Sequence, residues 1–228
     1  MSKTRIATQD DVPAIARLIQ DSIQKDRLWL RFSASKSVQD EAYTTEIESL
    51  LEEHLYPSME DWVVEVVDLG GEGEPEIVSA AIWDVKGAQG PEVAKREHET
   101  YIRDHRLVKY IQILRSAQDK ASPRYPHSTW LQLLVTHPNH QGRGYAKDLV
   151  NSQVSRVKKE GGVLAAIGGS KAYIFFSGRG FSDLGPVEGS AGVAPDAETE
   201  TIKALSLVIK KVDKGKAFVG SVVDYVFR

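Results

Sequence analysis

Apolar residues recur along the chain with two different spacings, which together predict alternating helices and strands. The spacing typical of one helix face begins around Pro13 and continues through Ile15, Ile19 and Ile23. Shorter runs rich in valine and isoleucine are typical of strands. We therefore predict helices at about 12–23, 41–55, 145–160 and 170–177, and strands at 5–8, 61–68, 77–85, 130–136, 163–167, 201–212 and 218–227.

The connections between these elements indicate a mixed architecture. Glycines within 70–75 predict a turn that joins two strands into an antiparallel hairpin. The highly charged stretch 92–118 predicts one long helix or two shorter ones, and 186–200 predicts a surface loop. Strands that alternate with helices and have antiparallel edges predict an α/β fold of the mixed α+β kind. We expect one domain, 1–228, with a helical insertion at about 88–127 before the fourth strand.

Composition narrows the possible functions. The chain has 228 residues, of which 41% are hydrophobic and 27% are charged, as is ordinary for a globular protein. A net charge of −3 argues against nonspecific nucleic-acid binding, and the lack of cysteine excludes disulfides and thiolate zinc sites. No signal-peptide core and no apolar run near the ~20 residues of a membrane span is present. We expect a soluble cytoplasmic protein, monomer or homodimer, with no nucleic-acid, membrane or metal partner.

The stretch from Trp130 to Glu160 combines a strand, a glycine-bearing loop and a helix start. Its loop, QGRGYA at 141–146, lacks the third glycine of a dinucleotide fingerprint, because Lys147 stands there. The G-x-x-x-x-G-K-[ST] pattern of a P-loop is absent as well. Backbone amides of such a loop, with the positive end of the helix, can nevertheless hold a pyrophosphate. A loop with a purely structural role is the alternative.

This segment also resembles a known family. The sequence LLVTHPNHQGRGYA at 133–146 is similar to the acyl-CoA-binding segment of the GNAT family of N-acetyltransferases. That family's motif is Q/R-x-x-G-x-G/A, whose fixed positions match Gln141, Gly144 and Ala146. The succession of T-H-P and Q-G-R-G is most like that of small-molecule members from filamentous fungi.

The resemblance extends beyond the loop. Residues 80–83 (AAIW) are similar to the family's third strand, and 179–181 (RGF) to the x-G-F that follows its fourth helix. Over about 5–212 the order of elements also matches. The resemblance implies a central mixed, mostly antiparallel sheet flanked by helices.

The resemblance implies acetyl-CoA as the donor substrate and assigns it a site. The strand before the loop would hydrogen-bond the pantetheine arm, and the loop would hold the pyrophosphate. The implied cofactor-binding residues are Leu134, Val135, Thr136, Gln141, Gly142, Arg143, Gly144, Tyr145, Ala146, Ser170 and Phe176.

The groups that transfer protons are less well matched. Many family members carry a glutamate on the fourth strand, but 128–133 has no carboxylate. The tyrosine that serves many members as general acid is replaced here by Phe176, so Tyr173, one turn earlier, is the candidate acid, with a packed aromatic as the alternative. Candidate bases are Asp84, His127 and His137; Asp84 could instead be a surface acid and His137 a loop cap.

The reaction that the resemblance implies is direct attack by a small-molecule amine on the acetyl group in a ternary complex. The candidate residues of the acceptor pocket are Trp29, Phe32, Trp83 and Trp130. Three alternatives remain: a catalytically silent acyl-CoA-binding protein, a protein or peptide N-acetyltransferase, and an unrelated α/β domain.

Overall fold

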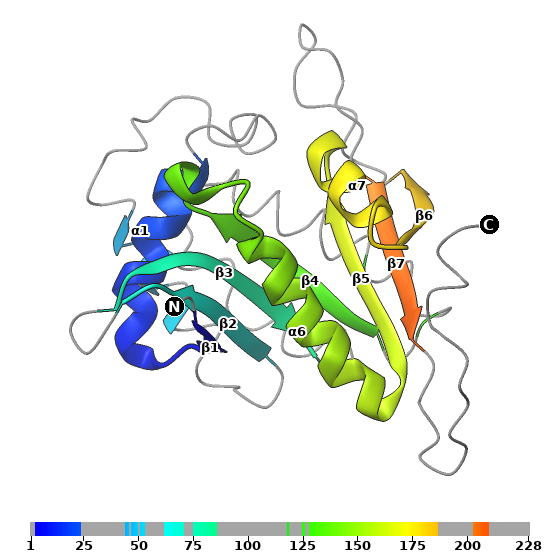
Figure 1. Cartoon of the computed structure of the whole chain (residues 1–228), viewed down its shortest axis with the longest axis horizontal. Helices are drawn as coiled ribbons and strands as arrows, with labels where there is room; N and C mark the ends of the chain where they lie inside the picture. Colours follow the sequence, from blue (N-terminus) through cyan, green and yellow to red (C-terminus); the bar gives the residue numbers. More distant parts are fainter. Residues whose placement is uncertain are drawn as a thin grey trace, which may run out of the picture.

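The computed structural model describes residues 3–23, 44–45, 47–49, 51–52, 62–70, 75–85, 118, 125, 128–186 and 203–209. Its elements follow the predicted alternation of strands and helices (Figure 1). They are β1 (Lys3–Ile6), η1 (Gln9–Asp11), α1 (Val12–Ile23), β2 (Trp62–Asp68), β3 (Ile77–Asp84), β4 (Ser128–Thr136), η2 (Pro138–His140), α6 (Tyr145–Glu160), β5 (Gly162–Gly168), α7 (Ser170–Ser177), β6 (Ser182–Pro186) and β7 (Lys203–Ile209).

The strands form one seven-stranded sheet in the order β1-β2-β3-β4-β5-β7-β6. Every neighbouring pair is antiparallel except β4 and β5, which run parallel. β2 and β3 form the hairpin that the glycine-rich turn predicts. The expected mixed, mostly antiparallel sheet flanked by helices is therefore confirmed.

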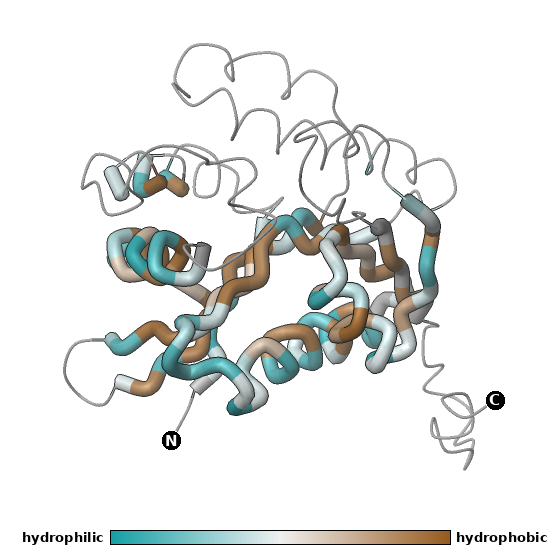
Figure 2. The backbone as a smooth tube through the Cα atoms, turned by 90° about the horizontal axis from the view of Figure 1, so that it is seen from above, coloured by the Kyte–Doolittle hydropathy of each residue, from teal (hydrophilic) through white to brown (hydrophobic). Residues whose placement is uncertain are grey.

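Helices cover both faces of this sheet (Figure 1). Alternate residues of β3 show the division: Ala80 and Ile82 pack in a core cluster with α1, whereas Ala81 and Trp83 pack in a second cluster with α6 and α7. Hydrophobic stretches run along the central strands in Figure 2, while the helices alternate hydrophobic and hydrophilic turns. Both faces of the central strands are therefore buried, which explains their nearly continuous apolar sequences.

One strand was not predicted. β6, with the sequence SDLGP, has no apolar alternation and pairs with β7 at the edge of the sheet. Several predictions lie outside the described residues: the helical insertion apart from Gln118, which is helical, and Tyr125, most of the loop at 186–200, and the strand at 218–227. Of the helix predicted at 41–55, the described residues are helical. No helix among the residues described is long and apolar enough to cross a membrane.

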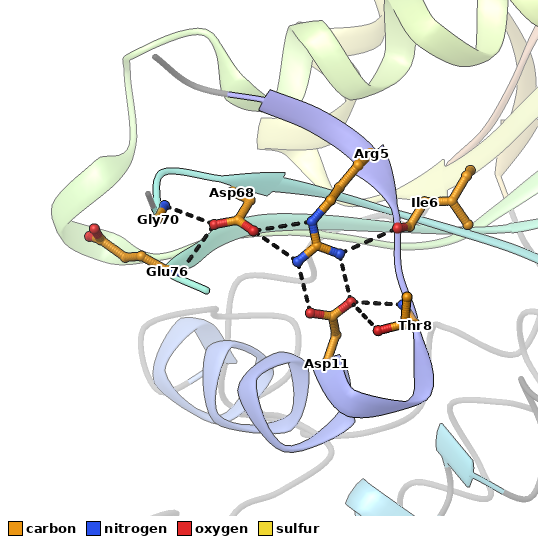
Figure 3. A network of polar contacts seen from close by, with 7 residues as sticks. All are labelled: Arg5, Ile6, Thr8, Asp11, Asp68, Gly70 and Glu76. Atoms are coloured by element: carbon orange, nitrogen blue, oxygen red, sulfur yellow. Dashed lines mark hydrogen bonds and ion pairs between the residues drawn. The ribbon is translucent and has the colours of Figure 1, made fainter. Parts of the chain in front are cut away.

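The N-terminal strand is joined to the β2–β3 hairpin by ion pairs (Figure 3). The Arg5 guanidinium donates to both Asp11 carboxylate oxygens, at 2.7 and 2.8 Å, and to Asp68 Oδ2 at 2.8 Å. The other Asp68 oxygen accepts from the backbone amides of Gly70 and Glu76 on the two sides of the hairpin turn. One arginine therefore fixes β1, the start of α1 and the end of the hairpin together.

A buried carboxylate lies beneath α6. Glu65, on β2, is 2% exposed and accepts a hydrogen bond from Ser152 Oγ at 2.6 Å. The guanidinium of Arg156, one helical turn further, lies 3.6 Å from the same carboxylate oxygen. Glu65 Oε2 has no hydrogen-bond partner among the residues described. Burial therefore raises the pKa of Glu65, and the Ser152 and Arg156 contacts offset part of that rise.

Asp11→Asn should destabilise the protein at neutral pH but much less in acid. The hydrogen bonds from Arg5 lower the pKa of Asp11 from 3.8 to about 2. Because the folded pKa lies below the unfolded one, the carboxylate stabilises the fold above about pH 4, and this stabilisation is lost as the pH falls toward 2. We expect a loss of about 2 kcal/mol in the free energy of unfolding at pH 7. Denaturant titrations from pH 7 to pH 2 measure it.

The matched control is Asp10→Asn, which changes the same charge at an exposed neighbouring position. It should leave stability nearly unchanged across that range. An Asp11→Asn penalty that stays constant with pH would contradict the assignment.

Glu65→Gln should show the opposite pH trend. Because the folded pKa of Glu65 lies above the unfolded one, its carboxyl stabilises the fold at low pH, and this contribution is lost as the pH rises through the folded pKa. Wild type should therefore lose stability relative to Glu65→Gln between about pH 4 and pH 7. Urea titrations of both proteins, with exposed Glu52→Gln as the control, measure the trend. A difference that does not change with pH would refute it.

Candidate functional site

The parallel strands β4 and β5 pair over only part of their length. Residues 128–131 of β4 lie opposite 163–166 of β5, and no β5 partner exists for 132–136. The two strands diverge from this point in Figure 1. On its other edge β4 stays paired with β3 as far as Thr136. The β5-facing backbone of 132–136 is therefore an ordered strand edge, to which an extended ligand can add as a further strand.

A β-bulge lies at the point of divergence. Ile82 of β3 lies opposite Leu133, and Trp83 lies opposite Leu131, so Gln132 has no partner on β3. The extra residue turns Leu131 toward the α6 face and leaves Leu133 packed on the α1 face. Leu131 is the last β4 residue that pairs with β5, and the bulge follows at Gln132. The opening between the strands is therefore set by the register of β4.

The loop after β4 is held by its own hydrogen bonds. The His137 amide donates to Val78 O at 2.9 Å, which extends the contact with β3. The His137 side chain accepts from the Asn139 amide at 3.2 Å and so caps η2, while its Nε2 lies 3.7 Å from Asp21 Oδ2. Gln141 Nε2 donates back to Thr136 O at 3.2 Å. The loop therefore returns to the end of β4 and places its glycines beside the opening.

The glycines shape an open cradle in front of α6. Gly142 and Gly144 have left-handed φ angles of 75° and 91°, which favour glycine. A Cβ atom added at either position would meet no atom within 4 Å, so the space before the backbone is open. Gly144 is the N-cap of α6 and offers no side chain to its first amides. Those amides and the positive end of the helix fit a phosphate or pyrophosphate group.

Other residues that the sequence predicts to bind acetyl-CoA lie on the loop and on α7. Arg143 is exposed and donates to Asn139 O at 3.3 Å. On the β5 side, α7 begins at Ser170 directly after the strand, and packs against β5 and β7. Phe176 near its end is 3% exposed and lies against Phe181, with ring centroids 4.9 Å apart. The loop residues therefore follow the end of β4 and Ser170 follows the end of β5, whereas Phe176 is buried in the core.

The predicted catalytic and acceptor residues are more dispersed. Asp84 ends β3, Tyr173 lies half-buried on α7, and His137 caps the loop. Trp83 and Trp130 are 0% and 1% exposed, so both rings lie within the protein interior. Trp29, Phe32 and His127 lie outside the described residues, so their predicted roles stay predictions.

Two functional candidates were missed by sequence reasoning. Gln132 at the bulge donates to Gln118, and Gln118 donates to Asp84. The only sequence signal was a polar residue between Leu131 and Leu133 in an otherwise apolar stretch. Among the residues described, no group of three or more histidine or acidic side chains could hold a metal ion.

Solved structures with the same fold are N-acetyltransferases. Arylalkylamine N-acetyltransferase 2 from Aedes aegypti has 15% sequence identity and a TM-score of 0.67, covering 92% of this chain and 99% of that chain. A polyamine N-acetyltransferase from Drosophila melanogaster, which catalyses the formation of N-acetylagmatine, has 14% identity and a TM-score of 0.65, covering 92% and 100%. An acetyltransferase from Salmonella typhimurium with its cofactor acetyl-CoA has 14% identity and a TM-score of 0.55, covering 95% and 98%.

Sequence comparison alone finds none of this, because no protein-family model and no curated protein matches the chain. The similarity to filamentous fungal members stays a prediction. At identities this low the similarity establishes architecture, and that architecture is the one the resemblance to the GNAT family implied. The chain has the fold of the N-acetyltransferases.

Proposed function

We propose that this protein is an acetyl-CoA-dependent N-acetyltransferase that acts on a small-molecule amine in a ternary complex. One observation carries the proposal: the divergence of β4 and β5 opens onto an uncapped helix N-terminus with two left-handed glycines. An unpaired strand edge suits an extended amide-bearing arm, and the cradle beside it suits a pyrophosphate. Pantetheine and pyrophosphate are joined in this way in coenzyme A.

The donor would be held chiefly by backbone. Residues 134–136 offer their β5-facing amides and carbonyls to the pantetheine arm, and the amides of 142–146 surround the pyrophosphate. Arg143 adds a positive charge beside it. Ser170 and Phe176 contact the arm from α7, across the opening. Open space in front of Gly142 and Gly144 supports this assignment, because a bulky phosphate needs the room that a side chain would fill.

The reaction that fits this arrangement is direct transfer. The donor supplies an acetyl group on a thioester; the amine nitrogen bonds to its carbonyl carbon, the C–S bond breaks, and the displaced proton ends on the thiol. A β4 amide near the bulge is placed to stabilise negative charge on the carbonyl oxygen. Tyr173 is the proposed acid, and His137 and Asp84 are the proposed bases. Positioning and oxyanion stabilisation supply most of the acceleration, since a thiolate is a good leaving group.

A small amine is the acceptor class that the structural neighbours favour, because two of those described act on arylalkylamines or polyamines by name. The net charge of −3 is compatible with a cationic acceptor. Trp29 and Phe32 are the proposed aromatic residues around it, whereas Trp83 and Trp130 are too deeply buried to contact an acceptor directly. A catalytically silent acyl-CoA binder is the second candidate, because 128–133 lacks a carboxylate and Phe176 replaces the expected tyrosine.

Acetyl-CoA should stabilise the wild-type protein, and Gly144→Glu should abolish the effect. At a concentration of ~100 times Kd, the ligand adds about 2.7 kcal/mol to the free energy of unfolding, a shift of a few degrees in Tm. The glutamate would place bulk and negative charge in the phosphate cradle. Thermal unfolding with and without acetyl-CoA measures both effects.

Gly185→Glu is the matched control for this experiment. Gly185 also has a left-handed φ, 100°, with open space around an added Cβ, but it lies on β6 at the edge of the sheet. This variant should retain the full shift. If wild type shows no shift at millimolar acetyl-CoA, the donor assignment is wrong.

An amine panel should separate enzyme from binder. We expect release of free CoA with at least one of 2-phenylethylamine, agmatine and spermidine, and none with an N-terminal peptide. A thiol reagent can measure the product directly, because the chain has no cysteine of its own. A blank panel despite acetyl-CoA binding would favour the silent binder, and acetylation of the peptide alone would favour a protein acceptor.

A further inference from the structure

A chain of three polar side chains runs from the end of β3 to the bulge of β4. Gln118 Nε2 donates to Asp84 Oδ2 at 2.6 Å, and Gln132 Nε2 donates to Gln118 Oε1 at 3.4 Å. Gln118 is 4% exposed, whereas Gln132 is half-buried. Buried amides are costly unless they are hydrogen-bonded, and this chain satisfies them in sequence.

The carboxylate sets the direction of these hydrogen bonds. An ionised Asp84 can only accept, so Gln118 must turn its NH2 group toward it and its carbonyl toward Gln132. Gln132 must then turn its own NH2 group to Gln118. Gln132 Oε1 is therefore the last acceptor in this row of hydrogen bonds. Successive hydrogen bonds polarise one another, so the charge of Asp84 makes this terminal oxygen a stronger acceptor.

The Gln132 end of this hydrogen-bonded row lies where β4 and β5 separate. Gln132 is the first β4 residue without a β5 partner, and it is the bulged residue opposite β3. Asp84 lies opposite Trp130 and two residues after Ile82, so alternation along β3 places it on the α1 face. The proposed phosphate cradle at the start of α6 follows the C-terminal end of β4. An arm that runs from the cradle along 134–136 would thus carry its thioester toward Gln132.

We propose that Gln132 Oε1 accepts a hydrogen bond from the acceptor amine and orients its lone pair toward the thioester carbon. This inference rests on the proposed function. Gln118 and Asp84 act through Gln132 as positioning residues, which leaves His137 as the proposed base. As the C–N bond forms and the C–S bond breaks, positive charge grows on the nitrogen, and the polarised amide with Asp84 behind it stabilises that charge. The surplus N–H proton ends on the CoA sulfur, so Gln132 needs no proton of its own.

This arrangement gives a role to a strand that has no carboxylate. A neutral amide cannot serve as a base, but it can fix the nitrogen at the carbonyl, and orientation alone contributes substantially to rate. It also defines a class of acceptor: a primary or secondary amine keeps an N–H for Gln132 while its lone pair attacks.

Gln132→Leu tests the proposal. Its kcat/KM for the best amine of the panel should fall about tenfold to a hundredfold, as expected for loss of a hydrogen bond to a charged transition state. The acetyl-CoA-induced rise in Tm should stay at the wild-type value. Gln9→Leu makes the same change at an exposed site on η1 and should leave both quantities unchanged.

Two further variants test the direction of the hydrogen bonds among Asp84, Gln118 and Gln132. Asp84→Asn removes the charge that fixes the direction of the amides, so kcat/KM should fall while acetyl-CoA binding stays; Asp10→Asn is the matched control. Gln132→Glu restores an acceptor at the same place. It should recover part of the activity lost in Gln132→Leu.

The outcomes separate this inference from the function on which it rests. If Gln132→Leu binds acetyl-CoA and acetylates the amine as Gln9→Leu does, Gln132 does not contact the acceptor. If Gln132→Leu loses the acetyl-CoA shift, the residue serves β4 itself and the inference is likewise overturned. Absence of a shift in wild type, or a wholly blank amine panel, would overturn the enzyme assignment and this inference with it.

Discussion

The short parallel contact between β4 and β5 is the constraint on which the rest of the structure depends. Backbone groups of an inner strand normally pair on both edges, and an unpaired buried group is costly. Here β4 loses β5 after Leu131 yet stays paired with β3 to Thr136, so one edge opens while the strand remains ordered. α6 and α7 follow β4 and β5 respectively, and their N-termini therefore border the opening. The strand pairing of the sheet therefore creates the opening, and the loop after β4 only adds to it.

Charged groups hold the elements around that opening in two different ways. Arg5 is partly exposed and joins the buried Asp11 to the mostly buried Asp68, where several ionic hydrogen bonds offset the cost of desolvation. Glu65 is instead buried beneath α6, where its charge is only partly compensated. The hairpin fixed by Arg5 also reaches the loop, since Glu76 lies 3.9 Å from His140 Nε2. The N-terminal strand is thus linked through the hairpin to the loop before α6, although it lies far from that loop in sequence.

Local sequence signals predicted the fold well, whereas the donor-binding role of the loop stays a prediction. Helical and strand periodicity located α1, α6, α7 and the central strands, and the spacing of Gln141, Gly144 and Ala146 indicated the cradle. β6 escaped prediction because an edge strand is held by backbone hydrogen bonds that need no apolar pattern. The bulge at Gln132 escaped as well, because register depends on which residues of β3 lie opposite, and no single strand encodes its partner.

The sites proposed for the two substrates therefore differ in how the sequence encodes them. A donor bound by backbone amides requires only a strand edge, glycines and a helix start, all of which leave short-range signals in sequence. An acceptor bound by side chains depends on groups that distant elements bring together, as Asp84, Gln118 and Gln132 illustrate. Their separation along the chain leaves no motif, whereas a single glutamate on β4 would have been visible at once. Replacing one carboxylate by a polarised chain of amides moves the acidic group onto β3 and leaves a neutral acceptor at the bulge. Such a site can orient an amine without binding its proton, so its selectivity should follow the shape and N–H geometry of the acceptor more than the acceptor's basicity.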